Sequence, residues 1–366
     1  MNYSAEDRYR IWLNGISGIG PARFYRLMAE CGSAKAVWDN LSDLSEGLIR
    51  HLTSRTYANM KAARDEKLID EALEQLEQLH IEALTTESPR YPQPLREIYD
   101  APPVLFAKGD APTNYDRRFG VVGSRRATYD GKRIAREFSE LLSENGVSIV
   151  SGMALGVDAE AHRGALAGQT HTVAVLGCGV DVVYPPDNRR LYDQILDEGG
   201  LILSELPPGA QPLRGHFPLR NRIISGLSRG VLLVEGMQNS GAMITVDYAL
   251  DQGRDVFAVP GAVLSPMASA PNQLIMDGAI PALSGESILY HYGWADAPAP
   301  RPTRAEVQLD DDEKRVVSEL MYEPLSFDEL VMHTMLPADE LNTLLTMLEL
   351  RQLVQRLPGG LFRAHL

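Results

Sequence analysis

Residues 119–135 read FGVVGSRRATYDGKRIA, and residues 147–167 read VSIVSGMALGVDAEAHRGALA. Each stretch begins with a short apolar run, turns through glycine and serine, and continues into a segment of helical composition. This order predicts a buried strand, a tight loop and a helix, repeated twice. Because parallel strands need a long crossover, which is usually a helix, the two stretches predict a parallel sheet covered by helices on both faces.

The same alternation of apolar runs and helical segments continues on both sides of these stretches. Strands are expected at Val104–Lys108, Phe119–Val122, Val147–Val150, Thr172–Leu176, Leu201–Ser204, Val231–Val234 and Asp255–Val259. Helices are expected at Gly131–Glu144, Asp158–Ala167, Asn188–Asp197, Arg222–Ser228 and Thr245–Gln252. We therefore predict an α/β fold with a Rossmann-like, doubly wound, mostly parallel sheet.

Two proline-rich segments divide the chain. Residues 88–94 (SPRYPQP) break any helix, and residues 295–302 (ADAPAPRP) favour an extended linker. We predict a helical domain over residues 1–87, the Rossmann-like domain over 88–296, a Pro/Ala linker over 297–304 and a third domain over 305–366.

The two outer domains have patterns of their own. In residues 65–80, apolar side chains recur at helical spacing, with most of the acidic side chains on the other face. Residues 310–322 are amphipathic, Ser326 and Glu329 form a capping box, and Pro337 begins a third helix that runs to about residue 351. Two short strands around Gly359-Gly360 follow, at residues 353–357 and 361–364. Three helices and a β-ribbon predict a winged helix.

The composition excludes several classes of protein. Among 366 residues the only cysteines are Cys31 and Cys178, which argues against a disulfide or zinc scaffold and fits a reducing cytosol. No apolar run approaches the roughly 18–20 residues needed to cross a bilayer. The first residues, MNYSAEDRYR, do not resemble a secretory signal. We expect a cytoplasmic protein without a membrane partner.

The charge is unevenly distributed. The formal net charge of −14 argues against a nucleic-acid partner when it is taken as a mean. However, residues 117–136 carry seven basic side chains and one acidic one, and residues 206–234 carry four arginines and no acid. The negative mean therefore does not exclude DNA, but limits where on this protein DNA could bind.

The loops after the predicted strands are rich in small residues. They begin at Gly123, Ser151, Gly177 and Glu235. Ligands of open parallel sheets bind at the carboxyl ends of the strands, and small residues let backbone N–H groups approach an oxyanion, so the loops predict a phosphate-binding groove. The G-x-G-x-x-G and G-x-x-x-x-G-K-[ST] patterns are absent, which disfavours an NAD oxidoreductase and a P-loop ATPase.

Arginine and aromatic side chains lie in or beside these loops. Arg125, Arg220 and Arg222 offer forked contacts to phosphate. Phe217, with His216 beside it and Tyr184 upstream, offers a surface on which bases of a single strand could stack. An ordinary core position is an equally good interpretation of Phe217.

Catalytic patterns are few. Asp158 and His162 are four residues apart on one predicted helix and could form an acid/base pair, but a capping aspartate and a packed histidine are the simpler interpretation. Cys178 is interpreted as a small buried residue.

The order of several motifs resembles one known family. GSRRATYDGKRIA, SGMALGVDAEAH, VAVLGCGVDVVYPPDN, LILSELPPG, FPLRNRIISGLS, VEGMQNSGAMIT and GRDVFAVPG, preceded by YPQPLREIYDAPPVLFAKG, are similar to the DNA-processing protein A (DprA/Smf) family over residues 88–281. The resemblance implies a protein that binds and protects single-stranded DNA and loads the RecA recombinase on it, as in natural transformation. It also implies a homodimer that acts without catalytic turnover. We expect no cofactor and no metal site.

The same resemblance implies a set of DNA-binding residues. They are Gly123, Ser124, Arg125, Arg126, Ser151, Gly152, Phe217, Arg220, Asn221, Arg222, Ser240 and Gly241.

Residues 13–21 (LNGISGIGP) look like the hairpin of a helix-hairpin-helix motif, which binds DNA phosphates through backbone N–H groups. A SAM-like helical module that only packs is the alternative.

The winged helix also looks like the C-terminal module of the family. Its acidic run at residues 310–313 favours protein contact over DNA contact.

An enzyme is the rival hypothesis. The sheet and its glycine-rich loops also resemble nucleotide phosphoribohydrolases of the lysine-decarboxylase-like group, in which Glu235 and Thr245 would belong to a nucleoside-phosphate site. The P-G-G-x-G-T run typical of that group is missing.

Overall fold

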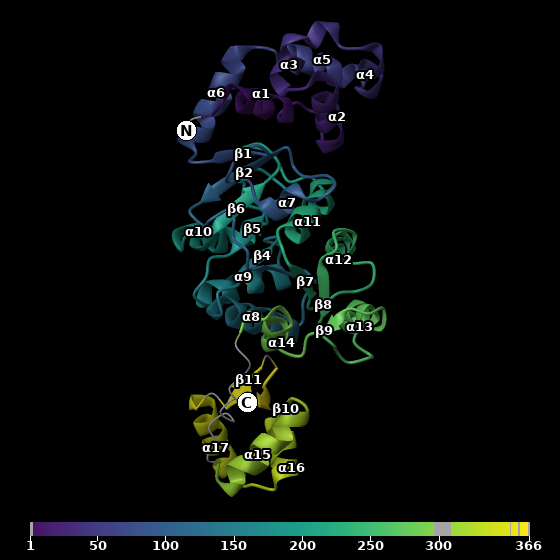
Figure 1. The fold of residues 1–366 in the computed structure, drawn as a ribbon. Helices are drawn as coiled ribbons and strands as arrows, with labels where there is room; N and C mark the ends of the chain where they lie inside the picture. Colours follow the sequence, from purple (N-terminus) through teal and green to yellow (C-terminus); the bar gives the residue numbers. More distant parts are fainter. Residues whose placement is uncertain (1–2, 296–308, 352, 358, 365–366) are drawn as a thin grey trace. The chain divides into compact units, whose positions relative to one another are not determined.

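The computed structural model describes residues 3–295, 309–351, 353–357 and 359–364 (Figure 1). The chain divides into two compact units, Met1–Asp296 and Ala297–Leu366, which are described separately. The predicted linker at residues 297–304 lies outside the described residues.

A nine-stranded sheet forms the centre of the first unit, in the order β1-β2-β6-β5-β4-β3-β7-β8-β9 (Figure 1). The strands are β1 (Glu82–Thr85), β2 (Val104–Gly109), β3 (Arg118–Val122), β4 (Ser148–Ser151), β5 (Val173–Val175), β6 (Leu201–Ser204), β7 (Gly230–Leu233), β8 (Asp255–Ala258) and β9 (Ile280–Pro281). From β6 to β9 neighbouring strands are parallel, whereas β1 and β2 extend one edge in antiparallel pairing. The predicted mostly parallel sheet is confirmed.

The chain reverses direction across the sheet at β3. From β3 it winds through β4, β5 and β6 to one side, and then returns to β7, which lies on the other side of β3. The register pairs Gly120 of β3 with Val150 of β4 and with Val231 of β7. Ligand crevices of doubly wound sheets lie at such a switch point, so a ligand site is expected at the loops after β3 and β7.

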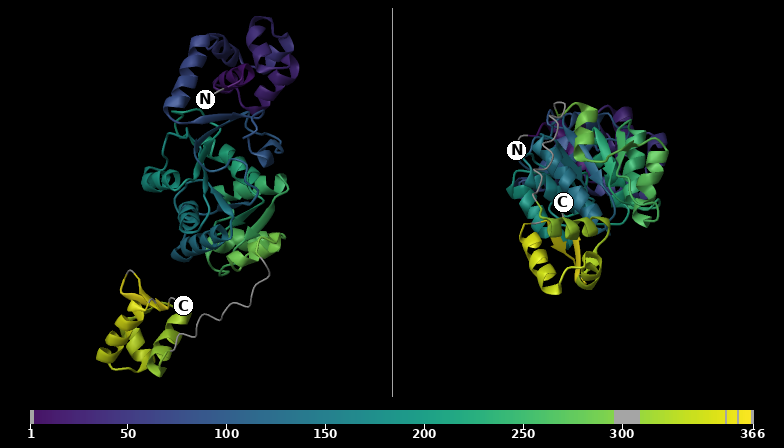
Figure 2. Two further views of the ribbon diagram at one scale, coloured as in Figure 1. Left: turned by 60° about the vertical axis from the view of Figure 1, so that its left-hand side comes forward. Right: turned by 90° about the horizontal axis from the view of Figure 1, so that it is seen from below.

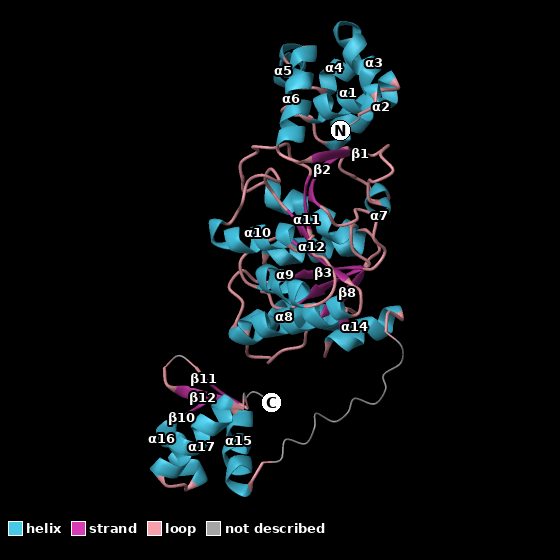
Figure 3. Ribbon diagram, turned by 90° about the vertical axis from the view of Figure 1, so that its left-hand side faces the viewer, coloured by secondary structure: helices cyan, strands magenta, loops and turns pink. Residues whose placement is uncertain are grey.

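Helices cover both faces of the sheet (Figure 3). One face carries α7 (Gln93–Arg96), α11 (His216–Gly226), α12 (Gly241–Asp251) and α13 (Ser269–Met276). The other face carries α8 (Tyr129–Glu144), α9 (Val157–Ala167), α10 (Arg189–Asp197) and α14 (Gly285–Tyr292). Short 3-10 turns lie at Leu41–Asp43, Pro186–Asn188 and Pro266–Ala268. Ile223 and Val246 belong to the core on the first face, and Leu142 and Ala161 to a core on the second.

Two of these helices begin four or more residues earlier than predicted. The sequence predicts helices from Arg222 and Thr245, whereas α11 begins at His216 and α12 at Gly241. Pro218 lies in the first turn of α11, where its missing N–H breaks no helical hydrogen bond, so proline does not mark a helix end here. Arg220, which the predicted helix does not include, therefore lies on α11 together with Arg222.

Six helices precede the sheet and gather at the end that carries β1 (Figure 2). They are α1 (Ala5–Asn14), α2 (Pro21–Cys31), α3 (Ala34–Asp39), α4 (Glu46–His51), α5 (Ser54–Ala62) and α6 (Glu66–Gln78). Trp12, Phe24 and Trp38 are in their own apolar core. Hydrogen bonds from Arg10 to Glu87 and from Thr85 to Asp7 join this block to β1 and the loop after it. The sheet begins at β1, before the predicted boundary at residue 88.

The second unit is a winged helix, as predicted. Its elements are α15 (Asp311–Tyr322), β10 (Leu325–Ser326), α16 (Phe327–Thr334), α17 (Ala338–Leu350), β11 (Val354–Arg356) and β12 (Leu361–Ala364). The strands pair in the order β10-β12-β11. Ser326 and Glu329 form the predicted capping box at α16. Gly359 and Gly360 have φ of 89° and 77°, the left-handed backbone that glycine adopts most easily.

Candidate nucleic-acid interface

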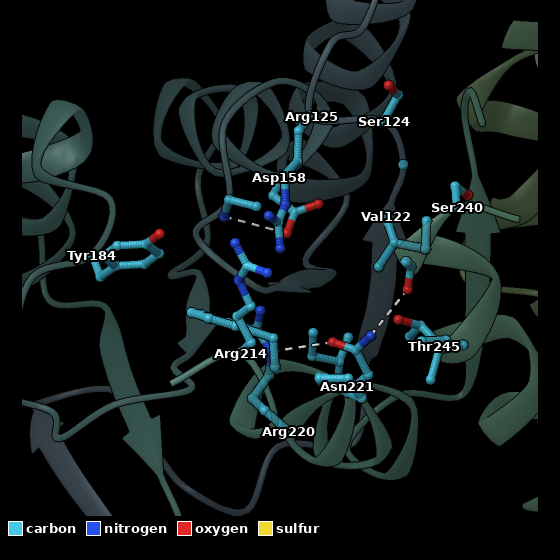
Figure 4. Close-up of a pocket in the computed structure, with 18 residues that line it drawn as sticks. Val122, Ser124, Arg125, Asp158, Tyr184, Arg214, Arg220, Asn221, Ser240 and Thr245 are labelled. Carbon is cyan, nitrogen blue, oxygen red and sulfur yellow. Dashed lines mark hydrogen bonds between the residues drawn. The ribbon is translucent and has the colours of Figure 1, made fainter. Parts of the chain in front are cut away.

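A cavity of about 660 Å³ opens at the carboxyl ends of β3 and β7, at the switch point (Figure 4). It is lined by Val122, Gly123, Ser124, Arg125, Ala154, Asp158, Tyr184, Arg214, Phe217, Pro218, Arg220, Asn221, Ile224, Ser240, Gly241, Ala242, Ile244 and Thr245. We call this cavity the groove. Eight of the twelve predicted DNA-binding residues line it: Gly123, Ser124, Arg125, Phe217, Arg220, Asn221, Ser240 and Gly241.

The loop after β3 needs glycine at its first position. A Cβ on Gly123 would lie 2.6 Å from Val157 Cγ2 and 2.9 Å from the Glu235 carbonyl oxygen. The Ser124 N–H donates to that same carbonyl at 2.8 Å, and the Ser124 carbonyl accepts from Val157 N–H at 3.2 Å. The loop is therefore pinned between β7 and the start of α9, with Arg125 exposed beyond it.

Three planar groups from three segments meet at one side of the groove. The Arg125 guanidinium lies 5.7 Å from the centroid of the Phe217 ring. The Tyr184 ring lies 5.4 Å from that ring, tilted by 33°. Figure 4 shows Tyr184 facing the arginine side chains across the cavity. Phe217 is half-buried, lines the groove and does not belong to the apolar cores of the sheet, so part of its side chain is exposed there.

Arg220 reaches from α11 under the carboxyl ends of the central strands. Its guanidinium donates to the carbonyl of Gly152, at 2.7 Å, and to that of Val175. Burial lowers its pKa to about 10, and Asp158 acts in the opposite direction, so the side chain keeps its positive charge at neutral pH. The residue is only 5% exposed, so it is a fixed charge in the wall of the groove.

The amide of Asn221 joins α11 to α12. Its Nδ2 donates to the Gly241 carbonyl at 3.2 Å, and its Oδ1 accepts from Arg220 Nε at 3.2 Å. Gly241 begins α12, and Ser240 precedes it without capping it by a side-chain hydrogen bond. The first N–H groups of a helix carry a partial positive charge, which adds to that of the arginines.

Asp158 and His162, which could have formed an acid/base pair, are not arranged as one. The Asp158 carboxylate accepts from the N–H groups of Gly152 and Ala154, at 3.2 and 3.4 Å. His162 Nδ1 lies 2.8 Å from Thr172 Oγ1, whose own proton goes to the Ile149 carbonyl, so Nδ1 donates to Thr172. Burial raises the pKa of Asp158 and lowers that of His162 to about 3. His162 is a packed residue, as the simpler interpretation has it, whereas Asp158 is not the N-cap: Gly156 precedes α9, and Asp158 lies inside its first turn.

Four predicted residues do not line the groove. Arg126 is exposed on the same loop as Arg125. Ser151 is buried and donates to the Val121 carbonyl at 2.7 Å. Gly152 lies behind Arg220, where a Cβ would be 2.7 Å from the guanidinium nitrogens.

Arg222, the fourth of these residues, is paired with acidic side chains. Its guanidinium is 2% exposed and bonds Asp100 and Glu205, each at 2.7 Å. Residues two apart on a helix point in nearly opposite directions, so Arg220 enters the groove while Arg222 points away from it. The structure does not bring Arg222 to the other predicted residues.

Two family models match the chain. That of "DNA recombination-mediator protein A" matches residues 82–293, and that of the "DprA winged helix domain" matches residues 298–360. A protein Smf of Synechocystis is 33% identical over 97% of this chain and 98% of its own length. This chain belongs to the DprA/Smf family.

Two solved structures of the DprA/Smf family are similar to this chain. DprA of Streptococcus pneumoniae has a TM-score of 0.65 at 33% identity, covering 79% of this chain and 98% of that one. DNA processing protein A of Helicobacter pylori, described for its single-stranded DNA binding mode, has a TM-score of 0.51 at 28% identity, covering 58% of this chain and 96% of that one.

Sequence reasoning did not assign some residues that line the groove. Arg214 lies in the acid-free window 206–234, and Tyr184 is an aromatic side chain upstream of it. Asp158 and Thr245 are candidates for catalysis in the sequence. Arg214 shares with Arg220 the signal of a basic side chain near the start of α11, but sequence patterns do not show that its side chain points into the groove. Tyr184 comes from a loop after β5 whose path cannot be derived from periodicity.

The predicted hairpin at residues 13–21 is a short turn between α1 and α2. Gly18, with φ of 97°, and Gly20 lie in this turn. Together with Leu219 and Arg220 they line a second cavity of about 370 Å³, so the turn lies beside the groove. DNA binding by this turn, and its alternative of packing alone against the rest of the protein, both stay predictions. The protein-contact role of the winged helix also stays a prediction.

Within the described residues, no group of three or more metal-ligating side chains occurs. No helix among them is both long and apolar enough to cross a membrane. Cys178 is buried, its thiol donates to the Val182 carbonyl, and burial raises its pKa to about 11, which fits the prediction of an unreactive packed residue.

Proposed function

We propose that this protein is a single-stranded DNA-binding recombination mediator, which protects the strand and loads the RecA recombinase on it, as in natural transformation. The observation that carries the proposal is the meeting of Arg125, Arg214 and Arg220 with the Tyr184–Phe217 pair in one groove. The solved structure from Helicobacter pylori supports it, since that relative is described by its single-stranded DNA binding mode.

The groove suits a single strand better than a duplex. Phosphates would be held by Arg125 and Arg214, by backbone N–H groups of the loop after β3 and by the start of α12. A base would stack on the Phe217 ring, which requires that one face of the base be free. In a duplex both faces of each base are covered by its neighbours. Binding should therefore be tolerant of sequence and selective for unpaired strands.

The remaining predicted residues take supporting roles in this proposal. Arg126 would contact a phosphate at the outer edge of the groove. Ser151 and Gly152 would form the floor that fixes Arg220, and Ser240 and Gly241 the opposite wall. Arg222 is assigned to holding α11 against Asp100 and Glu205, not to DNA.

We infer that the protein acts without chemical turnover. The rival phosphoribohydrolase hypothesis needs Glu235 free, but both oxygens of its carboxylate accept from Thr128, at 2.6 and 2.8 Å. His162 is buried, neutral and engaged with Thr172. Incubation with nucleoside monophosphates tests this inference: release of free base at a catalytic rate would overturn it.

A homodimer and a RecA contact belong to the same proposal. Val263, Leu264, Met276 and Leu283, around α13 and β9, are 77–95% exposed, and clustered exposed apolar side chains mark contact surfaces. Light scattering on the purified chain measures its molar mass and so shows whether it is a dimer. RecA filament growth on single strands coated with single-strand-binding protein measures loading. A monomer, or no acceleration of filament growth, would remove the corresponding part of the proposal.

A gel-shift comparison of single-stranded and duplex DNA at two salt concentrations tests the proposal as a whole. We expect tighter binding of the single strand at both salts, and weaker binding of both at higher salt. Equal affinity for the duplex would contradict the groove mechanism.

A further inference from the structure

Glu235 holds both ends of the short segment that carries Arg125 and Arg126. Its carbonyl oxygen accepts from Ser124 N–H at 2.8 Å, before the segment. After it, Glu235 Oε2 accepts from Thr128 N–H at 2.8 Å and Oε1 from Thr128 Oγ1 at 2.6 Å. Only residues 125–127 lie between the two attachments, so one residue of the loop after β7 fixes the segment at both sides.

The surroundings leave the Glu235 carboxylate little freedom. A Cβ on Gly131 would lie 2.3 Å from its Cδ and from one of its oxygens, so α8 approaches it directly. Thr128, the partner of the carboxylate, also caps α8, because the Gly131 N–H donates to Thr128 Oγ1 at 3.1 Å. A negative charge at the first turn of α8 is also favoured by the helix dipole.

We propose that Glu235 is a positioning residue for DNA binding: its carboxylate fixes the segment 125–127 so that Arg125 is held over Phe217 and points into the groove. This inference rests on the proposed function, since it assigns Glu235 a role in the same groove. The positioning role explains why a carboxylate lies beside a groove that is proposed to bind phosphates. Without such a role, the negative charge of Glu235 would only repel the DNA.

The sign of the effect separates positioning from simple electrostatics. Removing an acid close to a phosphate site should tighten DNA binding if the charge acts directly. If the carboxylate acts through the loop, its removal should weaken DNA binding although the protein becomes less negative. Asp247, exposed on α12, provides a matched control in which one acid is removed without touching the segment.

The test is fluorescence anisotropy of labelled oligo(dT) with Glu235→Ala, Glu235→Gln, Arg125→Ala, the double variant Glu235→Ala/Arg125→Ala and Asp247→Ala. We expect Glu235→Ala to weaken binding about fivefold or more, Glu235→Gln to lie between it and the wild type, and Asp247→Ala not to weaken it. The double variant should bind no more weakly than Arg125→Ala alone, because both changes remove one interaction.

Three results are decisive. Unchanged or tighter binding by Glu235→Ala, while Arg125→Ala weakens it, overturns the positioning role and leaves the proposed function intact. Multiplicative losses in the double variant overturn it as well. If Arg125→Ala has no effect, the groove assignment itself fails. Should Glu235→Ala not fold, Glu235→Gln, which keeps one acceptor oxygen, is compared with Arg125→Ala in the same way.

Discussion

The Arg125 guanidinium lies over the Phe217 ring, with Cζ 5.7 Å from the ring centroid. This contact joins the loop after β3 to the first turn of α11, two segments that are far apart in the sequence. Under the proposed function, it places the group that would bind a phosphate and the ring that would stack on a base within the reach of one nucleotide. The Tyr184 ring, from the loop after β5, lies 5.4 Å from the Phe217 ring.

Loss of Arg125 should lower both the affinity for single strands and its dependence on salt. Arg125→Ala removes one phosphate contact, so the slope of log affinity against log salt should fall by about 0.7. The measurement is a salt titration with oligo(dT). Arg133→Ala is the matched control, because Arg133 lies in the same basic window but pairs with Glu137 on α8. Equal changes in both variants would contradict the assignment of Arg125.

Arg222 should matter for folding and not directly for DNA. Arg222→Ala leaves Asp100 and the nearly buried Glu205 without their counter-charge, and breaking a buried pair costs about 3 kcal/mol of unfolding free energy. Urea denaturation measures this loss. The exposed Arg229, changed to Ala, should alter stability by less than about 0.5 kcal/mol. If Arg222→Ala leaves stability unchanged but abolishes DNA binding, the residue is a DNA contact after all.

The contrast between Arg220 and Arg222 shows what sequence patterns could and could not provide. Apolar periodicity predicted the strands from β2 to β8 and the crossover helices, because a covered parallel sheet leaves that pattern in each strand. It missed β1, which is an antiparallel edge strand, and β9, which has only two residues. It also began α11 six residues late, and so could not tell which arginine turns inward. The acids that bind Arg222 lie far from it in the sequence, so only the fold reveals the pair.

Gly152 should be needed because Arg220 occupies the space of a side chain. A methyl group there would lie 2.7 Å from the guanidinium nitrogens, so Gly152→Ala should displace Arg220 and weaken oligo(dT) binding as Arg220→Ala does. The double variant should be no weaker than either single variant. Gly215→Ala, where the added Cβ meets no atom within 4 Å, serves as the control. Normal DNA binding by Gly152→Ala would contradict the role of Arg220 as a fixed groove charge.

His162 should make the first unit less stable in acid. Burial lowers its pKa to about 3, whereas an unfolded histidine has a pKa of about 6.5. Between these two pH values the unfolded chain therefore binds a proton at this residue that the folded chain does not. Unfolding free energy should therefore fall with falling pH, by on the order of 2 kcal/mol between pH 7 and pH 5 from this residue. Denaturant titrations at both pH values measure it. His162→Gln should flatten the dependence; an unchanged slope would contradict it.

The most direct test of the central claim is to find where a bound single strand touches the protein. An oligonucleotide of 5-bromodeoxyuridine, irradiated in complex with the full chain, attaches to side chains that contact its bases, and mass spectrometry identifies the attachment sites. Base stacking in the groove predicts attachment at Phe217 or Tyr184, and loss of the Phe217 product in Arg125→Ala. Attachment confined to the winged helix or to the turn between α1 and α2 would contradict the account.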